Sequence, residues 1–137
     1  MAREFTFRGK TLEELKNMDL KEFANLLTSR GKRTLLRGIK LGWDLQHKAL
    51  MDKVKKFRQG SYSKPIKTHC RDMIVIPDMV GATIHIHSGK IFGPVNIIPE
   101  MIGHYLGELV VTRQKVEHSA PGVGATKSSA GVAKAKK

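Results

Sequence analysis

The sequence predicts an α+β fold, in which a helical N-terminal extension precedes a small sheet with short helices packed beside it. Two observations indicate this. Apolar residues recur at helical spacing up to about residue 59, and apolar and polar residues alternate between residues 80 and 88. Because side chains repeat every 3.6 residues in a helix and every two in a strand, the change of period predicts a change of structure.

Two helix-start signals lie near the N-terminus. Thr11 and Asp19 each precede a glutamate by three residues, a spacing at which cap and glutamate satisfy free backbone N–H groups of the first turn. We expect Gly31 to end the second helix. The packing face of that helix consists of Leu20, Phe23, Leu26 and Leu27.

A short basic helix or turn is predicted at residues 30–38, and a longer helix at residues 43–59, where Gly60 stops it. One stripe of the longer helix holds Trp43, His47, Leu50, Val54 and Phe57. Its helical spacing favours packing against the rest of the fold. Stacking of Trp43, His47 and Phe57 on nucleic-acid bases is the alternative.

Three β-type runs follow, at residues 73–76, 80–88 and 91–98. The second has one apolar face, and Ser88-Gly89 is typical of a hairpin turn into the third. Pro94 within the third run predicts an edge strand or a bulge, because proline cannot donate to a sheet. Pro99 opens a last short helix. The packing face of this helix consists of Met101, Ile102, Tyr105 and Leu106.

The chain divides into a helical basic extension (residues 1–63), an α+β core (64–116) and a flexible basic tail (117–137). Residues 119–137 are rich in Ser, Ala, Gly and Lys and include two valines as their only large apolar residues. Such a segment buries too little surface to offset its ordering entropy, so we expect it to be disordered in the free protein.

Positive charge gathers on both sides of a nearly neutral core. The net charge of +13 divides into 0 for residues 1–28, +10 for 29–67, −2 for 68–111 and +5 for 112–137. Basic arms suit folded RNA, because each Lys or Arg placed near a phosphate releases counterions. A solvated helix face and a soluble tail are the plainer interpretation.

Several classes of protein fit poorly. No apolar run is long enough to span a membrane, and the first residues lack the apolar stretch of a signal peptide. Cys70 is the only cysteine, which excludes a disulfide within the chain. These features predict a soluble protein of a reducing compartment.

Residues 70–113 resemble the ribosomal protein S19 family. The similarity lies in Arg71–Gly81, in Ser88–Lys90 and, most specifically, in Pro99–Leu109 followed by Thr112-Arg113. Residues 5–9, 65–72 and 121–126 are similar to archaeal and eukaryotic members, whereas residues 130–137 depart from that branch's ending.

The resemblance implies a structural protein of the small ribosomal subunit and not an enzyme. It implies rRNA binding in the subunit head, with ribosomal protein S13 as neighbour and the tail approaching the tRNA A site. It also implies a three-stranded sheet, and it gives no reason to expect a cofactor. The residues we expect on RNA are Arg30, Lys32, Arg33, Arg37, Lys64, Lys67, Arg71, Lys90, His104, Arg113, Lys115 and Lys127.

Other constellations have weaker support. His85 and His87 share a strand face, where a pair facing solvent or RNA is favoured over a metal site with His69, Cys70 or His104, since no zinc-type spacing is present. For the Gly103–Gly107 run, close packing and an RNA contact through His104 stay open together.

Two other functions remain as alternatives. A general basic DNA-binding or chromatin-like protein is permitted by the charge alone. An RNA-processing enzyme would need gathered carboxylates or a metal, and the acids of the core are scattered along the sequence.

Overall fold

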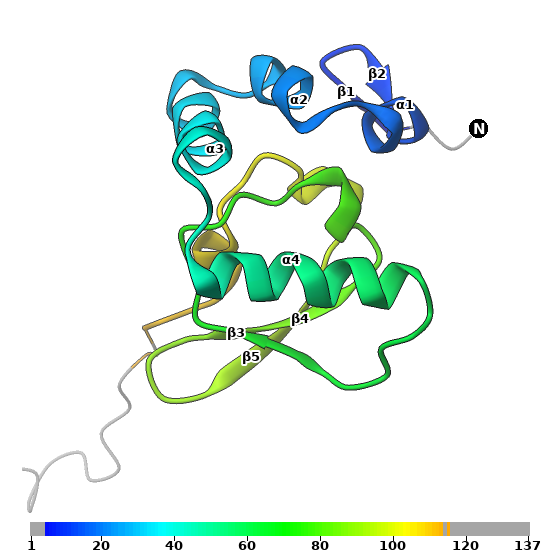
Figure 1. Cartoon of the computed structure of the whole chain (residues 1–137). Helices are drawn as coiled ribbons and strands as arrows, with labels where there is room; N and C mark the ends of the chain where they lie inside the picture. Colours follow the sequence, from blue (N-terminus) through cyan, green and yellow to red (C-terminus); the bar gives the residue numbers. More distant parts are fainter. Residues whose placement is uncertain (1–4, 114, 116–137) are drawn as a thin grey trace, which may run out of the picture.

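The computed structural model describes residues 5–113 and residue 115 and confirms the α+β prediction (Figure 1). A short hairpin with two residues in each strand, β1 (Thr6–Phe7) and β2 (Lys10–Thr11), precedes four helices and a three-stranded sheet. The helices are α1 (Leu12–Asn17), α2 (Leu20–Leu26), α3 (Ser29–Leu41) and α4 (Leu45–Arg58). The sheet consists of β3 (Ile66–Thr68), β4 (Thr83–His87) and β5 (Phe92–Asn96). No helix in the described ranges is long and apolar enough to cross a membrane.

The predicted helix starts lie where expected. At α1 the Glu14 N–H donates to the Thr11 hydroxyl at 3.5 Å, and the Thr11 N–H donates to the Glu14 carboxylate at 3.0 Å. Asp19 occupies the N-cap position of α2, although its side chain makes no capping hydrogen bond. The start of a helix is thus set by the position of the capping residue even where the reciprocal pair does not form.

The prediction that Gly31 ends the second helix is wrong. Helix α2 ends at Leu26 because Leu27 is extended, with ψ at 166°. Gly31 lies instead in the first part of α3 and is buried, and a Cβ there would lie 3.4 Å from the Leu27 Cβ. Its role is therefore close packing of α3 on the preceding turn. The short basic helix or turn expected at residues 30–38 is part of this 13-residue helix.

Helix α4 confirms the prediction for residues 43–59 to within two residues at each end. His47, Leu50 and Val54 are buried, as the stripe predicts, whereas Phe57 is 40 % exposed. Trp43 precedes the helix, and its ring lies so close to Gly38 that a Cβ there would be 2.6 Å from it. Trp43 thus packs within the protein, while Phe57 does so only in part.

The sheet has the order β3-β4-β5, with β3 parallel and β5 antiparallel to β4. The prediction of a first strand at residues 73–76 is wrong, because this segment forms only a bridge between Ile74 and Tyr105. It is instead a buried connection, in which the Val75 N–H donates to the His104 carbonyl at 2.8 Å. Pro94 lies in β5, an edge strand, as its missing N–H predicts.

The single helix predicted after Pro99 is also wrong. From Pro99 on, the structure has two 3₁₀ turns, η2 (Pro99–Met101) and η3 (Leu106–Leu109), while η1 (Pro77–Met79) lies earlier in the chain. Gly103 separates them with φ at +87°, a conformation that L side chains rarely adopt and that cannot continue a helix. A Cβ at Gly103 would lie 3.1 Å from the Leu27 Cδ2, so this turn also accommodates the chain between α2 and α3.

The buried residues form one cluster that runs through the described chain. It joins Phe23 and Leu35 of the N-terminal helices to Leu50 of α4 and to Ile66 and Ile84 of the sheet. Figure 1 shows α1, α2 and α3 on one side of the connecting loops and 3₁₀ turns, with α4 and the sheet on the other side. The domain boundaries at residues 63 and 116 stay predictions.

Candidate nucleic-acid interface

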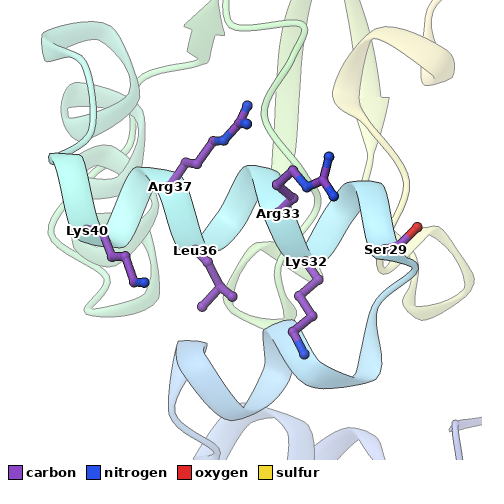
Figure 2. A pocket seen from close by; sticks show the side chains of 6 residues that line it. All are labelled: Ser29, Lys32, Arg33, Leu36, Arg37 and Lys40. Carbon is purple, nitrogen blue, oxygen red and sulfur yellow. The ribbon is translucent and has the colours of Figure 1, made fainter.

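Helix α3 presents a basic face with a leucine in its middle (Figure 2). Spacings of three and four residues bring this set to one side of the helix. Its members are Ser29, Lys32, Arg33, Leu36, Arg37 and Lys40, and they line a shallow hollow. We call this set the α3 basic face.

The cations of the α3 basic face form no ion pair among the residues that the structure describes. No Asp or Glu occurs between residues 23 and 43, and none of the ion pairs shorter than 4.0 Å within residues 5–113 and 115 includes a cation of α3. Asp44 and Asp72 line a neighbouring hollow together with Arg37 without pairing with it. Lys32, Arg33 and Arg37 are exposed. The α3 basic face is therefore a surface of largely unpaired positive charge.

Helix stability accounts for this charge only in part. Arg30 and Lys32 lie in the first turn of α3, where the aligned peptide dipoles disfavour cations, and Thr28 provides no side-chain cap. Lys40 lies in the last turn, where the dipole favours it, as it favours the cations at the end of α4. The basic residues in the first turn and the middle of α3 are thus not explained by the helix dipole.

Arg71 is a structural link. One guanidinium nitrogen donates to the His87 carbonyl at 2.7 Å and the other terminal nitrogen donates to the Gly107 carbonyl at 3.1 Å. Gly107 is required there, because a Cβ would lie 3.0 Å from the Arg71 carbonyl oxygen. Arg71 therefore joins the end of β4 to η3. Its expected contact with a phosphate stays a prediction.

A second group of the expected RNA-binding residues surrounds the sheet. Lys64 precedes β3, Lys67 lies on β3, and Lys90 lies in the hairpin between β4 and β5; all three are exposed. Near them, the rings of His69, His87 and Phe92 form a cluster with centroids between 4.4 and 5.1 Å apart.

The remaining expected residues lie towards the C-terminal side. His104 is exposed, and its Nδ1 is 2.8 Å from a carboxylate oxygen of Glu108, to which it donates. Arg113 and Lys115 are exposed. Lys127 and the tail of residues 117–137 lie outside the described residues. The structure thus distributes the described members over α3, the sheet and the C-terminal segment.

The glycines near His104 support the packing interpretation, since Gly103 lies against Leu27 and Gly107 against Arg71.

Cys70 is 4 % exposed, and its N–H donates to the Thr68 hydroxyl at 3.0 Å. In the part of the chain that the structure describes, no group of three or more His, Cys, Asp or Glu side chains could hold a metal ion.

The sequence analysis left three candidate residues out of the RNA-binding set. Lys40 completes the α3 basic face, three residues after Arg37, and helical spacing could have identified it. His69 and Phe92 join His87 only through the pairing of three strands. Because the first strand was predicted to begin at residue 73 and begins at Ile66, seven residues earlier, that neighbourhood could not be predicted.

One protein family has a model that matches this chain. The model, described as Ribosomal protein S19, matches residues 37–118, which is more than half of the 137 residues. The match begins near the end of α3 and spans α4, the sheet and the 3₁₀ turns η1, η2 and η3.

Proposed function

Because the chain belongs to the ribosomal protein S19 family, whose members are structural and non-enzymatic rRNA-binding components of the small subunit, we propose that it binds rRNA of the subunit head through the α3 basic face. The observation that carries this proposal is the set of exposed cations on α3 that form no ion pair within the described residues. Phosphates would supply the charge that the protein itself does not.

Physical chemistry favours RNA shape over sequence at this surface. An A-form major groove is too narrow for side chains to read, so cations on a rigid helix position the protein on the phosphate backbone. Arg33 and Arg37 can each grip a phosphate with two N–H groups, whereas Lys32 acts as a point charge. Lys64, Lys67, Lys90, Arg113 and Lys115 supply further contacts in this proposal.

Helices α1 and α2 and most of α3 precede the matched region, and they suit a member of the archaeal and eukaryotic branch. This extension is held to the body of the fold, since the hydroxyls of Thr34 and Tyr105 are 3.3 Å apart and share a hydrogen bond. We include in the proposal a cytoplasmic location, S13 as a neighbour in the head and an approach of residues 117–137 to the tRNA A site. The exposure of Arg113 and Lys115, just before that tail, supports an RNA contact at the point where the tail begins.

The test is incorporation into small subunits. A tagged wild-type chain would be compared with a triple variant of α3, Lys32→Gln, Arg33→Gln and Arg37→Gln, by sedimentation of cell lysates in moderate and high salt. The matched control carries Lys48→Gln, Lys55→Gln and Lys56→Gln, which removes three exposed cations from α4.

We expect the wild-type chain and the α4 control to sediment with small subunits at both salt concentrations. The α3 variant should be released at high salt, because fewer phosphate contacts remain. Equal retention of both variants would exclude α3 as the main contact. Sedimentation of the wild-type chain with DNA would favour the alternative, a general DNA-binding protein.

A further inference from the structure

The sheet has two unlike faces. In β4, Ile84 and Ile86 are completely buried, whereas His85 and His87 between and beside them are partly exposed. The strand pairing brings Lys67 and Pro94 beside His85, and Phe92 beside His87. We call this side of the sheet, with His69 just beyond β3, the open face.

Three rings gather at one end of the open face. His69 and His87 have centroids 4.4 Å apart, and Phe92 meets both edge to face, at 5.0 and 5.1 Å. Lys67 places its Nζ 5.7 Å from the Phe92 centroid, over the ring. His69 is exposed while the other two rings are partly buried, so His69 is the outermost ring of the cluster.

The supporting rings are held in place before any ligand arrives. His87 Nδ1 accepts a hydrogen bond from the Gly89 N–H at 3.3 Å, and the His87 carbonyl accepts one from Arg71 at 2.7 Å. Rings that are already ordered lose little conformational entropy on binding, which favours affinity. The cluster is therefore a preorganised aromatic surface.

The charge around the cluster suits a polyanion. No acidic residue occurs in residues 53–71 or in residues 79–99, which together include all three strands and the hairpin. Lys64, Lys67 and Lys90 are exposed within these segments. Asp44 and Asp72 share a hollow with His69, whereas the strands and the hairpin contribute no carboxylate. An aromatic surface with cations beside it is the combination that single-stranded nucleic acids use, with bases on rings and phosphates on cations.

We propose that the open face binds an unpaired rRNA base, which stacks on His69 with His87 and Phe92 beneath it, while Lys67 or Lys90 contacts the adjoining phosphate. This inference rests on the proposed function, because it assumes an RNA partner. It adds a mode of contact that the α3 basic face lacks, since that face has cations and a leucine but no ring.

The experiment compares two RNA probes of equal length and charge. One is a short oligouridine, and the other has the same backbone with abasic sites. The ratio of their Kd values for the full-length protein removes the electrostatic contribution that both share. Three proteins would be compared with the wild type: His69→Ala, Phe92→Leu and, as matched control, Phe57→Leu, which alters a 40 % exposed phenylalanine on α4.

For the wild-type protein we expect the abasic RNA to bind about 5- to 100-fold more weakly, the range that stacking of a base supplies. The His69 and Phe92 variants should lower that ratio towards one, and the Phe57 control should keep it. Because His69 is exposed, its variant tests the inference even if Phe92→Leu is poorly folded.

Three results overturn the inference in distinguishable ways. If the wild-type protein binds oligouridine but the His69 and Phe92 variants keep its ratio, RNA is bound elsewhere and only the stacking proposal is wrong. If the wild-type protein binds neither probe, the open face takes up no unpaired base and the stacking proposal is wrong, whereas the proposed function is decided separately by incorporation into small subunits. A wild-type ratio of one with tight binding shows that cations alone carry the interaction and also refutes stacking.

Discussion

The two faces of the sheet differ although they are built from alternate residues of the same strands. On the covered face, Ile66, Ile84 and Ile86 join the common core with Leu50 of α4. On the open face, Lys67, His85 and His87 stay partly or fully exposed. One face thus provides the free energy of folding, whereas the other can change without unfolding the protein and is free for recognition.

The largest effect should come from the covered face. We expect Ile86→Ala to lower the free energy of unfolding by about 2–5 kcal/mol, since Ile86 is completely buried and its removal leaves a cavity. Urea-induced unfolding measures this. His85→Ala, one residue away on the open face, should change stability by less than about 1 kcal/mol. Equal losses in the two variants would contradict the difference between the faces.

Arg71→Ala should have the next largest effect, a loss of about 1–3 kcal/mol, because the variant leaves two partly buried carbonyls, at the end of β4 and in η3, without their donor. Thermal unfolding of Arg71→Ala and Arg71→Lys in parallel tests whether Arg71 acts as a structural link between β4 and η3 or only as a cation that contacts phosphate. Lysine keeps the charge but cannot reach both carbonyls in the same geometry. If Arg71→Lys restores full stability, the double hydrogen bond is not what matters.

Lys67→Gln should change stability by only about 0.5–1 kcal/mol, the range of an exposed cation–π contact with Phe92. The same substitution should have a clearer effect on the salt dependence of RNA binding. Loss of one phosphate contact reduces the slope of log K against log salt by about 0.9 for a duplex and about 0.7 for a single strand. Binding titrations at several salt concentrations would reveal this, and an unchanged slope would show that Lys67 touches no phosphate.

The smallest effect is expected for Gly93→Ala in β5. An added Cβ would lie 3.4 Å from the Val110 Cγ1, an ordinary contact, and Gly93 does not have a positive φ. We expect a stability change within about 0.5 kcal/mol. A strongly destabilised variant would show that Val110 and β5 cannot move apart, and that the covered face is packed more rigidly than its contacts indicate.

Prediction from the sequence succeeded where the signal was local. The capping residue Thr11, the alternation in β4 and the edge proline of β5 each act within a few residues, and the structure confirms them. It failed where tertiary contacts decide. Residues 73–76 look like a strand but are buried by pairing with residues 103–106, whereas β3 is three residues long and too short to show a period.

The same distinction applies to the candidate interface. The basic residues of α3 lie close together in the sequence, so most of them were identified from it. The prediction did not include Lys40, which completes the helical face. The cluster of His69, His87 and Phe92 depends on the register of β3 with β4 and of β4 with β5. No pattern within one segment indicates such a cluster, because its members come from three segments that only the fold brings together.

The hydrogen bond between Thr34 and Tyr105 has a consequence for synthesis of the chain, because its partners are 71 residues apart. At about 5–20 residues per second, Thr34 is made roughly 4–14 s before Tyr105. During that interval helix α1 can already contact η1, but Thr34 lacks its partner Tyr105, and Phe7 and Leu27 lack the turn at Gly103. The N-terminal helices thus depend on the last quarter of the chain for part of their final contacts.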